Sequence, residues 1–350
     1  MVTPTLGYAA RDEANPLSRF DFERRDLRPA DVQIDIHYCG VCHSDLHQVH
    51  NDWGNTVYPL VPGHEIVGRV AAIGSEVDKF TVGDVVAVGC LVDSCQRCEP
   101  CEGGEEQYCL KAATQTYNDK DRIDGSPTHG GYSKRIVVRQ EFVLRLSDKL
   151  DPAAAAPLLC AGITVYSPLN YHRVSSGTRL GVIGLGGLGH MAIKFGAAMG
   201  AEVTLFTTSP SKIEEAKRLG AHKVVLSSDR EQMKTARGYF DLLIDTVPKP
   251  HSMNEYLMCL RRNGNMVLVG PIGMMDPPIH LGLLISARKA LSGSAIGGIS
   301  ETQQMLDFCA DRGITCDVEM INIQDINQAY ERMQRNDVHY RFVIDMASLK

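Results

Sequence analysis

The first residues that point to chemistry are four cysteines that lie close together in the chain. They follow the pattern Cys-x2-Cys-x2-Cys-x7-Cys at Cys95, Cys98, Cys101 and Cys109. Four thiolates on one loop satisfy a tetrahedral zinc ion without help from distant residues. An iron–sulfur cluster is the alternative, but its motif continues with three residues and a Cys-Pro pair, where this chain places seven residues before the fourth cysteine. The spacing therefore predicts a structural zinc site.

A second group of potential metal ligands is spread along the chain. Residues 40–47 read GVCHSDLH, residues 63–65 read GHE, and Cys160 follows much later. A catalytic zinc needs about three protein ligands and one open position, and two cysteines with one histidine form a known set. Spacing alone does not select Cys42 and His64 with Cys160, because other side chains compete for the role. The competitors are Cys39, His43 and Cys90.

A glycine-rich hexapeptide predicts a dinucleotide site. Residues 184–189 read GLGGLG, follow the apolar run Leu180–Ile183 and open an amphipathic stretch over Gly189–Met199. In this strand–turn–helix setting, GxGxxG places a pyrophosphate at a helix N-terminus. A purely structural glycine turn is the alternative, but the flanking elements favour the cofactor. The residues expected to line the phosphates are Gly184, Leu185, Gly186, Gly187, Leu188 and Gly189.

The segment after the next strand indicates which dinucleotide binds. An NAD enzyme carries Asp or Glu about 20 residues further on, at the end of the second strand, to bind the ribose hydroxyls. Here residues 207–212 read TTSPSK and include no carboxylate. The hydroxyls and the one cation suit a 2′-phosphate, although serine and threonine also cap helices. We expect NADP(H), bound through Thr207, Thr208, Ser209, Ser211 and Lys212.

The elements that must position these residues differ between the two halves of the chain. The first half reads as short β-rich segments, such as Asp31–Tyr38 and Glu65–Ile73, bounded by Gly or Pro. Beyond Pro152, strands alternate with helices such as Lys212–Leu219, which predicts parallel βαβ units and a doubly wound sheet. The fold class is therefore α/β, with a β-dominated domain first. Periodicity does not decide which domain takes the last segment of the chain.

Composition fits a globular enzyme and argues against several other classes. The chain has 350 residues, a formal net charge of −6 and 44% hydrophobic residues, and this acidic balance disfavours nucleic acid and anionic membranes as partners. No stretch reaches the ~20 apolar residues of a membrane-spanning helix, and the first residues lack the pattern of a secretory signal. Eleven cysteines, seven of them between Cys39 and Cys109, suit metal sites in a reducing compartment. We expect a cytoplasmic location.

Together these motifs resemble those of the zinc-dependent medium-chain alcohol dehydrogenase family. GHE, the four-cysteine loop and GLGGLG occur in the family's order. The segments GVCHSDLH, YPLVPGHEIVG and LLCAGITVYSPL resemble the cinnamyl alcohol dehydrogenase branch, in particular its bacterial broad-specificity NADP-dependent aldehyde reductases. The resemblance extends over nearly the whole chain. It implies an oxidoreductase that transfers a hydride between NADP(H) and aldehydes or primary alcohols, with aldehyde reduction favoured.

The resemblance assigns roles around the second metal group. It implies that Cys42, His64 and Cys160 hold a catalytic zinc, with Glu65 as a fourth or transient ligand. Asp45 would orient His64 by accepting a hydrogen bond from its ring. With the four-cysteine loop, this makes two zinc ions per chain.

Further residues are placed by the resemblance around the substrate and the cofactor. Ser44 and His47 would relay a proton, with the cofactor ribose between them, so that Ser44 also touches the cofactor. The other residues expected beside the cofactor are Thr164, Thr246, Gly270, Ser294, Ala295 and Ile296. The expected walls of the substrate pocket are Trp53, Leu91 and Tyr117.

For the fold, the resemblance implies two domains. A GroES-like β-rich catalytic domain would cover residues 1–153 and be completed by 301–350, and a Rossmann NADP-binding domain would cover 154–300. The family also implies a homodimer joined through the cofactor domains. A polyol or secondary-alcohol dehydrogenase of the same fold is the alternative activity. A non-enzymatic nucleotide-binding protein is disfavoured, because every expected ligand and both relay residues are present.

Overall fold

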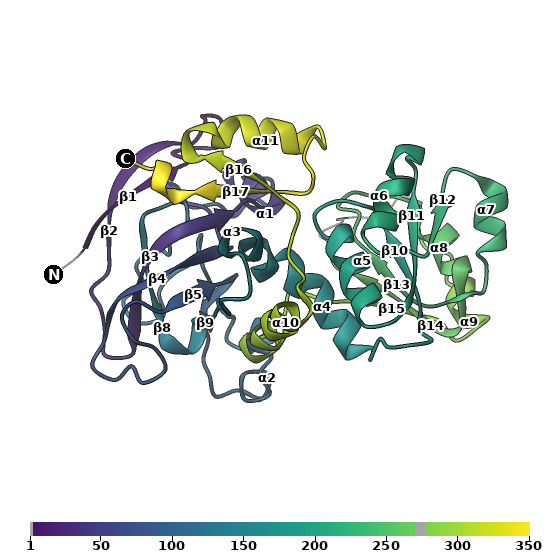
Figure 1. Ribbon diagram of the computed structural model, residues 1–350, viewed down its shortest axis with the longest axis horizontal. Helices are drawn as coiled ribbons and strands as arrows, with labels where there is room; N and C mark the ends of the chain where they lie inside the picture. Colours follow the sequence, from purple (N-terminus) through teal and green to yellow (C-terminus); the bar gives the residue numbers. More distant parts are fainter. Residues whose placement is uncertain (1–2, 271–272, 274–276) are drawn as a thin grey trace. The chain divides into compact units, whose positions relative to one another are not determined.

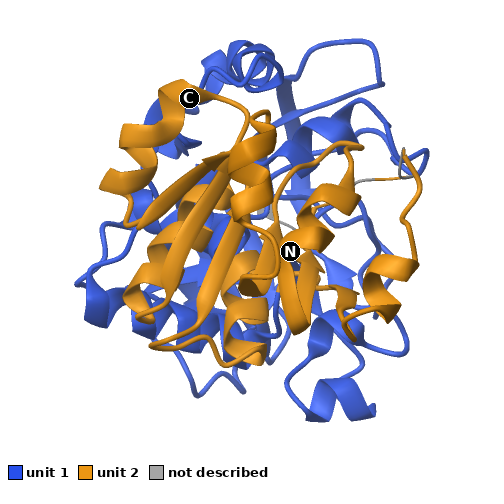
Figure 2. Ribbon diagram, turned by 90° about the vertical axis from the view of Figure 1, so that its right-hand side faces the viewer, with its two compact units in different colours: residues 1–163, 297–350 blue, residues 164–296 orange. Residues whose placement is uncertain are grey.

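The computed structural model describes residues 3–270, 273 and 277–350 (Figure 1). The chain divides into two compact units (Figure 2). The first contains residues 1–163 and 297–350, and the second contains residues 164–296.

The sequence placed these boundaries at 153–154 and 300–301. The first boundary differs because residues 152–159 form the helix α3 (Pro152–Ala155) and a 3-10 turn, Ala156–Leu159. Both pack against strands of the first unit. The apolar run that the sequence assigned to the cofactor domain therefore belongs to the core of the other unit.

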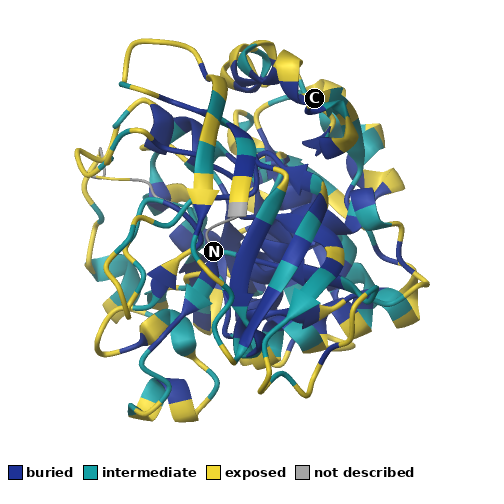
Figure 3. Cartoon of the chain, turned by 90° about the vertical axis from the view of Figure 1, so that its left-hand side faces the viewer, coloured by how far each residue is buried: buried dark blue, intermediate teal, exposed yellow. Residues whose placement is uncertain are grey.

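A seven-stranded, mostly antiparallel sheet forms the centre of the first unit. Its strands run in the order β16-β17-β3-β4-β5-β9, with β8 paired to β3, and only β16 and β17 pair in parallel. These strands are β3 (Asp31–Gly40), β4 (Ile66–Ile73), β5 (Val85–Val88), β8 (Arg135–Arg139), β9 (Leu144–Arg145), β16 (Val318–Asn322) and β17 (Arg341–Asp345). The inner strands are largely buried (Figure 3). The predicted β-rich domain is confirmed.

Shorter elements complete the first unit. The remaining strands form two pairs, β1 (Thr3–Ala9) with β2 (Ser18–Arg24), and β6 (Leu91–Asp93) with β7 (Thr114–Gln115). The helices besides α3 are α1 (His43–Val49), α2 (Glu99–Glu102), α10 (Ile299–Arg312) and α11 (Ile326–Gln334). The helix α4 (Ala161–Tyr171) begins in the first unit and continues into the second. No single helix among the described residues has the length and apolar composition to cross a membrane. One bent pair of helices meets that test, by length and composition only: Pro152–Leu159 with Ala161–Tyr171.

The C-terminal segment returns to the first unit. The strand β17 pairs antiparallel with the end of β3, where Val343 lies opposite Gly40 and Ile344 opposite Cys39. This pairing places the last strand beside the backbone that leads into α1. Periodicity in the sequence did not decide which domain takes the last segment of the chain, and the structure assigns that segment to the first unit.

A six-stranded parallel sheet forms the second unit, with helices along its faces (Figure 2). The strands run in the order β12-β11-β10-β13-β14-β15. They are β10 (Arg179–Ile183), β11 (Glu202–Thr207), β12 (Lys223–Leu226), β13 (Phe240–Asp245), β14 (Leu260–Leu268) and β15 (Ala290–Gly293). The helices are α5 (Gly189–Ala198), α6 (Ile213–Arg218), α7 (Arg230–Thr235), α8 (Met253–Cys259) and α9 (Gly282–Ile285). The predicted doubly wound sheet is confirmed, and its strand order reverses between β10 and β13, where such folds bind ligands.

Candidate active site

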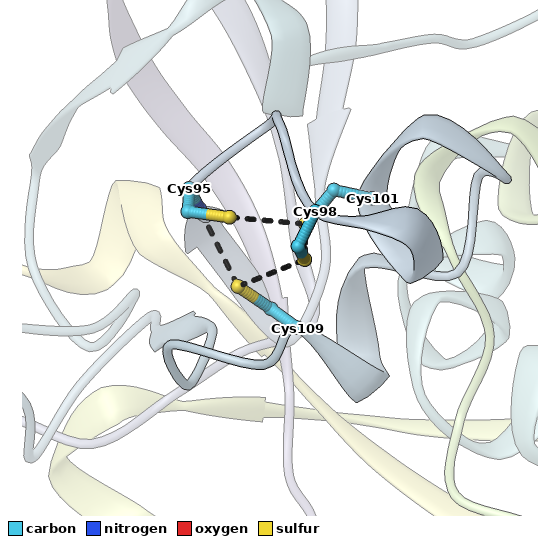
Figure 4. A group of neighbouring side chains, drawn as sticks. All are labelled: Cys95, Cys98, Cys101 and Cys109. Atoms are coloured by element: carbon cyan, nitrogen blue, oxygen red, sulfur yellow. Dashed lines mark hydrogen bonds between the residues drawn. The ribbon is translucent and has the colours of Figure 1, made fainter.

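The four cysteines of the predicted structural zinc site converge on one point of the first unit (Figure 4). The Sγ atoms of Cys98 and Cys101 are 3.4 Å apart, and Cys98 to Cys109 and Cys95 to Cys101 are both 4.0 Å. A tetrahedral ion with bonds of ~2.3 Å holds its sulfurs about 3.8 Å apart. The spacing of these sulfurs therefore fits zinc.

The backbone of this loop stabilises thiolates. The N–H of Leu110 donates to the sulfur of Cys98, and the N–H of Cys95 donates to that of Cys109, both at 3.5 Å. A further N–H, from Arg97, is the main cause that lowers the pKa of Cys95 to about 6. Burial raises the pKa of Cys101 to about 11, and a bound cation removes the proton from such a thiol. The donor set suits a metal ion.

The second metal-capable group is also in the first unit. It consists of Cys42, His64, Glu65 and Cys160, whose ligand atoms all lie within 4.8 Å of one another. The distance between the sulfurs of Cys42 and Cys160 is 3.8 Å, although 118 positions separate the two residues. Cys42 precedes α1, His64 and Glu65 precede β4, and Cys160 lies between the 3-10 turn and α4. The three-ligand set implied by the resemblance is therefore brought together.

The competing ligands do not join this group in the part of the chain that the structure describes. Cys90 lies beside Cys160 and donates to the carbonyl oxygen of Leu159 at 3.8 Å. The sulfur of Cys39 donates to the carbonyl of Gly40, and His43 is outside the group. Spacing in the sequence could not separate these residues, because the fold decides which of them converge.

A buried nitrogen shows that the second group suits a metal. The Nε2 atom of His64 is buried and has no hydrogen-bond partner among the described residues. An unpaired polar atom in the interior costs about 1–3 kcal/mol unless something satisfies it. The hydrogen bond from Cys160 lowers the pKa of Cys42 well below its ordinary value, while that of Cys160 is raised. Two sulfurs in contact and an orphan imidazole nitrogen form a donor set that zinc satisfies.

Asp45 fixes two of these ligands at once. It is fully buried in the first turn of α1, and it accepts hydrogen bonds from the N–H of Cys42 at 2.8 Å and of Gly63 at 3.0 Å. Its Oδ1 atom is 3.3 Å from Nδ1 of His64. An ionised carboxylate only accepts hydrogen bonds, so Nδ1 carries the hydrogen and Nε2 could bind a metal ion. The expected role of Asp45 thus has the geometry it requires.

A buried cation, which no sequence motif indicated, lies next to this group. Arg341, the first residue of β17, forms an ion pair with Glu65, and both side chains are almost fully buried. Burial raises the pKa of Glu65 well above its ordinary value, and the Arg341 guanidinium opposes that shift. Glu65 is thus held by a partner from the C-terminal segment. No sequence motif marks Arg341, because only the pairing of β17 with β3 brings it here.

The two expected relay residues lie on α1. The hydroxyl of Ser44 is 3.7 Å from the sulfur of Cys42. His47 lies one turn further along, with 32% of its side chain exposed. Its Nδ1 atom is 2.7 Å from a carboxylate oxygen of Asp52, a partner that sequence reasoning missed. With an ionised Asp52 as the acceptor, the hydrogen lies on Nδ1, which leaves Nε2 without it.

The three expected substrate contacts differ in their surroundings. The ring of Tyr117 stacks on His64 with centroids 5.6 Å apart, so it borders the metal group. Trp53 is 44% exposed, and its ring is 5.6 Å from that of His47. Leu91 is buried in β6. The structure thus brings Tyr117 and Trp53 to residues of the candidate site, whereas Leu91 has no described contact with them.

In the second unit, the glycine-rich turn follows β10 as predicted. Gly184 has φ +91°, a left-handed conformation that favours glycine, and an added Cβ would lie 3.1 Å from the hydroxyl of Thr246. Gly186 faces open space, so a ligand can approach its backbone. Thr246 follows β13 directly and donates to the carbonyl of Ile183 at 2.7 Å. The turn and Thr246 thus border the carboxyl ends of two neighbouring strands.

The hydroxyl-rich segment lies at the carboxyl end of β11. Lys212 reaches the glycine-rich turn, where its ammonium group donates to the carbonyl of Leu185 at 2.7 Å. Thr207 is buried at the strand end, and Ser211 is exposed. The predicted helix Lys212–Leu219 is wrong at its start, because Pro210 begins a 3-10 turn over Pro210–Lys212 and α6 starts at Ile213. The turn leaves the Lys212 side chain directed at the glycines.

The remaining expected cofactor contacts are spread over the second unit. Ser294 donates its N–H to the carbonyl of Leu268, and Ile296 has φ +37°. Gly270 lies beside Val247 and Pro248. Thr164 is buried on α4, and Thr208 is exposed. Ser209 donates its N–H to the hydroxyl of Thr207. The last of the expected contacts is Ala295.

Comparison with known proteins identifies the family. The model of the alcohol dehydrogenase GroES-like domain matches residues 28–148, and that of the zinc-binding dehydrogenase matches residues 187–311. The aldehyde reductase YahK of Escherichia coli (strain K12) is 52% identical over 335 residues, which make up 95% of this chain and 96% of that protein. The chain belongs to the zinc-dependent alcohol dehydrogenase family. As a member of this family it is an oxidoreductase.

Two further alcohol dehydrogenase relatives bear on substrate and cofactor. A probable mannitol dehydrogenase of Medicago sativa is 51% identical over 347 residues, with 98% of this chain and 95% of that protein covered. The structure of CAD from Helicobacter pylori, complexed with NADP(H), superimposes with a TM-score of 0.94 at 38% identity and covers both chains fully, 100% of each. These relatives confirm the predicted family, fold class and enzyme class.

Proposed function

We propose that this enzyme reduces aldehydes to primary alcohols with NADPH, at a zinc ion held by Cys42, His64 and Cys160. The observation that carries the proposal is the buried, unpartnered Nε2 of His64, which faces two thiols 3.8 Å apart. Glu65 would be a fourth or transient ligand, because Arg341 holds its Oε1 atom while its buried Oε2 atom has no hydrogen-bond partner among the described residues. The aldehyde substrate class is supported by the name of the Escherichia coli relative.

A second zinc ion in the four-cysteine loop would stabilise the fold. All four positions of a tetrahedral ion would be taken by thiolates, which leaves no open position for a substrate. The proposed content is thus two zinc ions per chain. The NADP(H) preference is supported by Thr207, Lys212 and the neighbouring hydroxyls, and by the cofactor bound to the Helicobacter pylori relative.

The proposed chemistry divides between bound groups and side chains. When bound, zinc supplies a Lewis acid for the carbonyl oxygen, and NADPH supplies the hydride. Ser44 would deliver a proton to that oxygen and would regain one from His47 by way of the cofactor ribose. His47 exchanges protons with solvent through Nε2, since Asp52 holds Nδ1. Asp45 keeps His64 in the one orientation in which Nε2 can bind a metal.

A polyol dehydrogenase is the second candidate, favoured by the name of the Medicago sativa relative. Initial rates separate the two activities. We expect kcat/KM for a panel of primary aldehydes with NADPH to exceed that for mannitol or its ketose under matched conditions. A preference for the polyol would replace the proposed substrate class and leave the zinc site intact.

Location and assembly are also proposals. Eleven free cysteines suit a reducing compartment, and we place the enzyme in the cytoplasm.

The second units of two chains would join in a homodimer, because β15 is an edge strand and the nearby Leu281 and Ile285 are 65% and 81% exposed. Sedimentation measures the oligomeric state: we expect the wild type to be a dimer and an Ile285→Asp variant to be a monomer. A monomeric wild type would contradict the proposed assembly.

A further inference from the structure

Two phenols extend the hydrogen bonding around the zinc ligands. The hydroxyl of Tyr132 donates to Asp45 at 3.3 Å, and the hydroxyl of Tyr330 donates to that of Tyr132 at 3.4 Å. Tyr330 belongs to α11, so a chain of hydrogen bonds runs from the C-terminal helix to the carboxylate that orients His64. None of these tyrosines was among the residues expected from the sequence.

The direction of this chain follows from its last member. An ionised carboxylate only accepts hydrogen bonds, so Tyr132 must donate to Asp45 and is free to accept from Tyr330. Tyr132 is 0% exposed and Tyr330 is 5% exposed. Burial raises the pKa of both phenols well above the ordinary value, so both keep the hydrogen that they donate.

The ring of Tyr132 is also fitted to the loop that holds His64. Gly63 precedes that histidine and has φ +103°, and a Cβ added to it would lie 2.6 Å from Cδ1 of Tyr132. A glycine is therefore required for the ring to reach its place. The N–H of the same glycine donates to Asp45. The phenol, the glycine and the carboxylate thus form one packed unit behind His64.

We propose that Tyr132 and Tyr330 are positioning residues for the catalytic zinc, acting through Asp45 on His64 and Cys42. Tyr132 supplies one of the donors that hold the carboxylate in the plane it needs for Nδ1 of His64. Tyr330 orients the Tyr132 hydroxyl. The proposal rests on the zinc site proposed above, and it makes the C-terminal helix part of the support for that site.

The test is the affinity for zinc, measured by chelator competition on the full-length protein. Removal of an outer hydrogen-bond partner typically weakens a metal site 10- to 100-fold. We expect Tyr132→Phe to release one of two zinc ions at about tenfold lower chelator concentration. The zinc of the four-cysteine loop should be unaffected. Tyr330→Phe should cause a smaller loss at the same ion only.

The double variant separates a chain from two independent effects. If Tyr330 acts through Tyr132, then Tyr330→Phe changes nothing in the Tyr132→Phe background. Tyr239→Phe is the matched control, because it removes a phenol that donates to a carboxylate, Glu202, at 2.7 Å in the second unit. That variant should hold both ions as the wild type does.

The following results would overturn the positioning role of Tyr132 and Tyr330: unchanged zinc affinity in both single variants, additive losses in the double variant, or equal loss of both ions. If Tyr132→Phe does not fold, Tyr330→Phe alone decides by whether its loss is confined to one ion. A wild type that binds one zinc ion, in the four-cysteine loop only, would overturn the proposed catalytic site as well, so the two failures are distinguishable.

Discussion

Two opposite charges face each other in the interior beside the proposed zinc ligands. Glu65 and Arg341 are 0% and 5% exposed, and each supplies the charge that the other needs there. Breaking such a pair by removing one partner typically destabilises a protein by about 3–5 kcal/mol, because the remaining charge is left unpaired. The pair also occupies Oε1 of Glu65 and leaves its buried Oε2 atom without a hydrogen-bond partner among the described residues. Both consequences can be measured at the scale of single residues.

We expect Arg341→Met to lower the free energy of unfolding by about 3–5 kcal/mol, measured by urea denaturation of the zinc-loaded protein. The double variant Arg341→Met/Glu65→Gln should recover part of that loss, because the glutamine carries no charge. Arg19→Met removes an exposed arginine and serves as the control. An Arg341→Met protein as stable as the wild type would show that Glu65 is satisfied in another way.

The proton relay gives a second prediction at this scale. His47→Ala should lower kcat by about 100-fold and flatten the pH–rate profile, because the exchange of protons with solvent is lost. The affinity for zinc and for NADPH should persist. Asp52→Asn should have a smaller effect of the same kind, since it removes only the group that fixes Nδ1. A His47→Ala enzyme with the wild-type pH–rate profile would contradict the relay.

At the scale of elements, hydrophobic periodicity predicted the strands and helices that have a buried apolar face. It did not predict the short helix whose residues are mostly polar. The strands β3 and β10 and the helix α5 bury their apolar positions, so their sequences reveal them. The helix α1 has seven residues, of which five are polar and three, Ser44, Asp45 and His47, belong to the candidate site, so no apolar stripe marks it. The start of α6 was misplaced because Pro210 imposes a 3-10 turn first.

The two cysteine groups belong to different elements, and this predicts different effects of substitution. Cys98→Ser should remove the ion of the four-cysteine loop and destabilise the protein, because metal binding at a structural site contributes folding free energy. Cys160→Ser should abolish aldehyde reduction but keep one zinc ion and most of the stability. Zinc analysis and urea denaturation of both variants check this. Equal loss of stability in the two would argue against the division of roles.

The segment between β11 and α6 predicts the choice of cofactor. The double variant Thr207→Asp/Lys212→Ala should reverse or erase the preference for NADPH, through lost attraction and added repulsion. The wild type should prefer NADPH over NADH by about tenfold to a thousandfold, if one to three charge-assisted bonds are at stake. The ratio of kcat/KM for the two cofactors is the measurement, with Lys212→Ala alone as the intermediate case. An unaltered ratio would show that this segment does not contact the phosphate.

At the scale of the whole molecule, the site depends on contacts between residues that are distant in the sequence. The motifs predicted which residue types would be ligands, but the ligand Cys160 lies 118 positions from Cys42. The helix α11 and the strand β17 supply Tyr330 and Arg341 because the last segment returns to the first unit. Such contacts carry no local pattern. The sequence could therefore predict the family, the candidate ligands and the supporting Asp45, but not Tyr132, Tyr330 and Arg341.

The most direct test of the proposed function is aldehyde reduction measured against zinc content. A chelator removes zinc stepwise from the wild type, and the rate of NADPH oxidation with a primary aldehyde is followed at each content. We predict that protein with one ion left in the four-cysteine loop is folded and inactive, and that activity returns in proportion to the second ion as zinc is restored. Full aldehyde reduction by protein with one zinc ion per chain would contradict a zinc-dependent aldehyde reductase. The absence of aldehyde reduction by protein with two zinc ions per chain would contradict it as well.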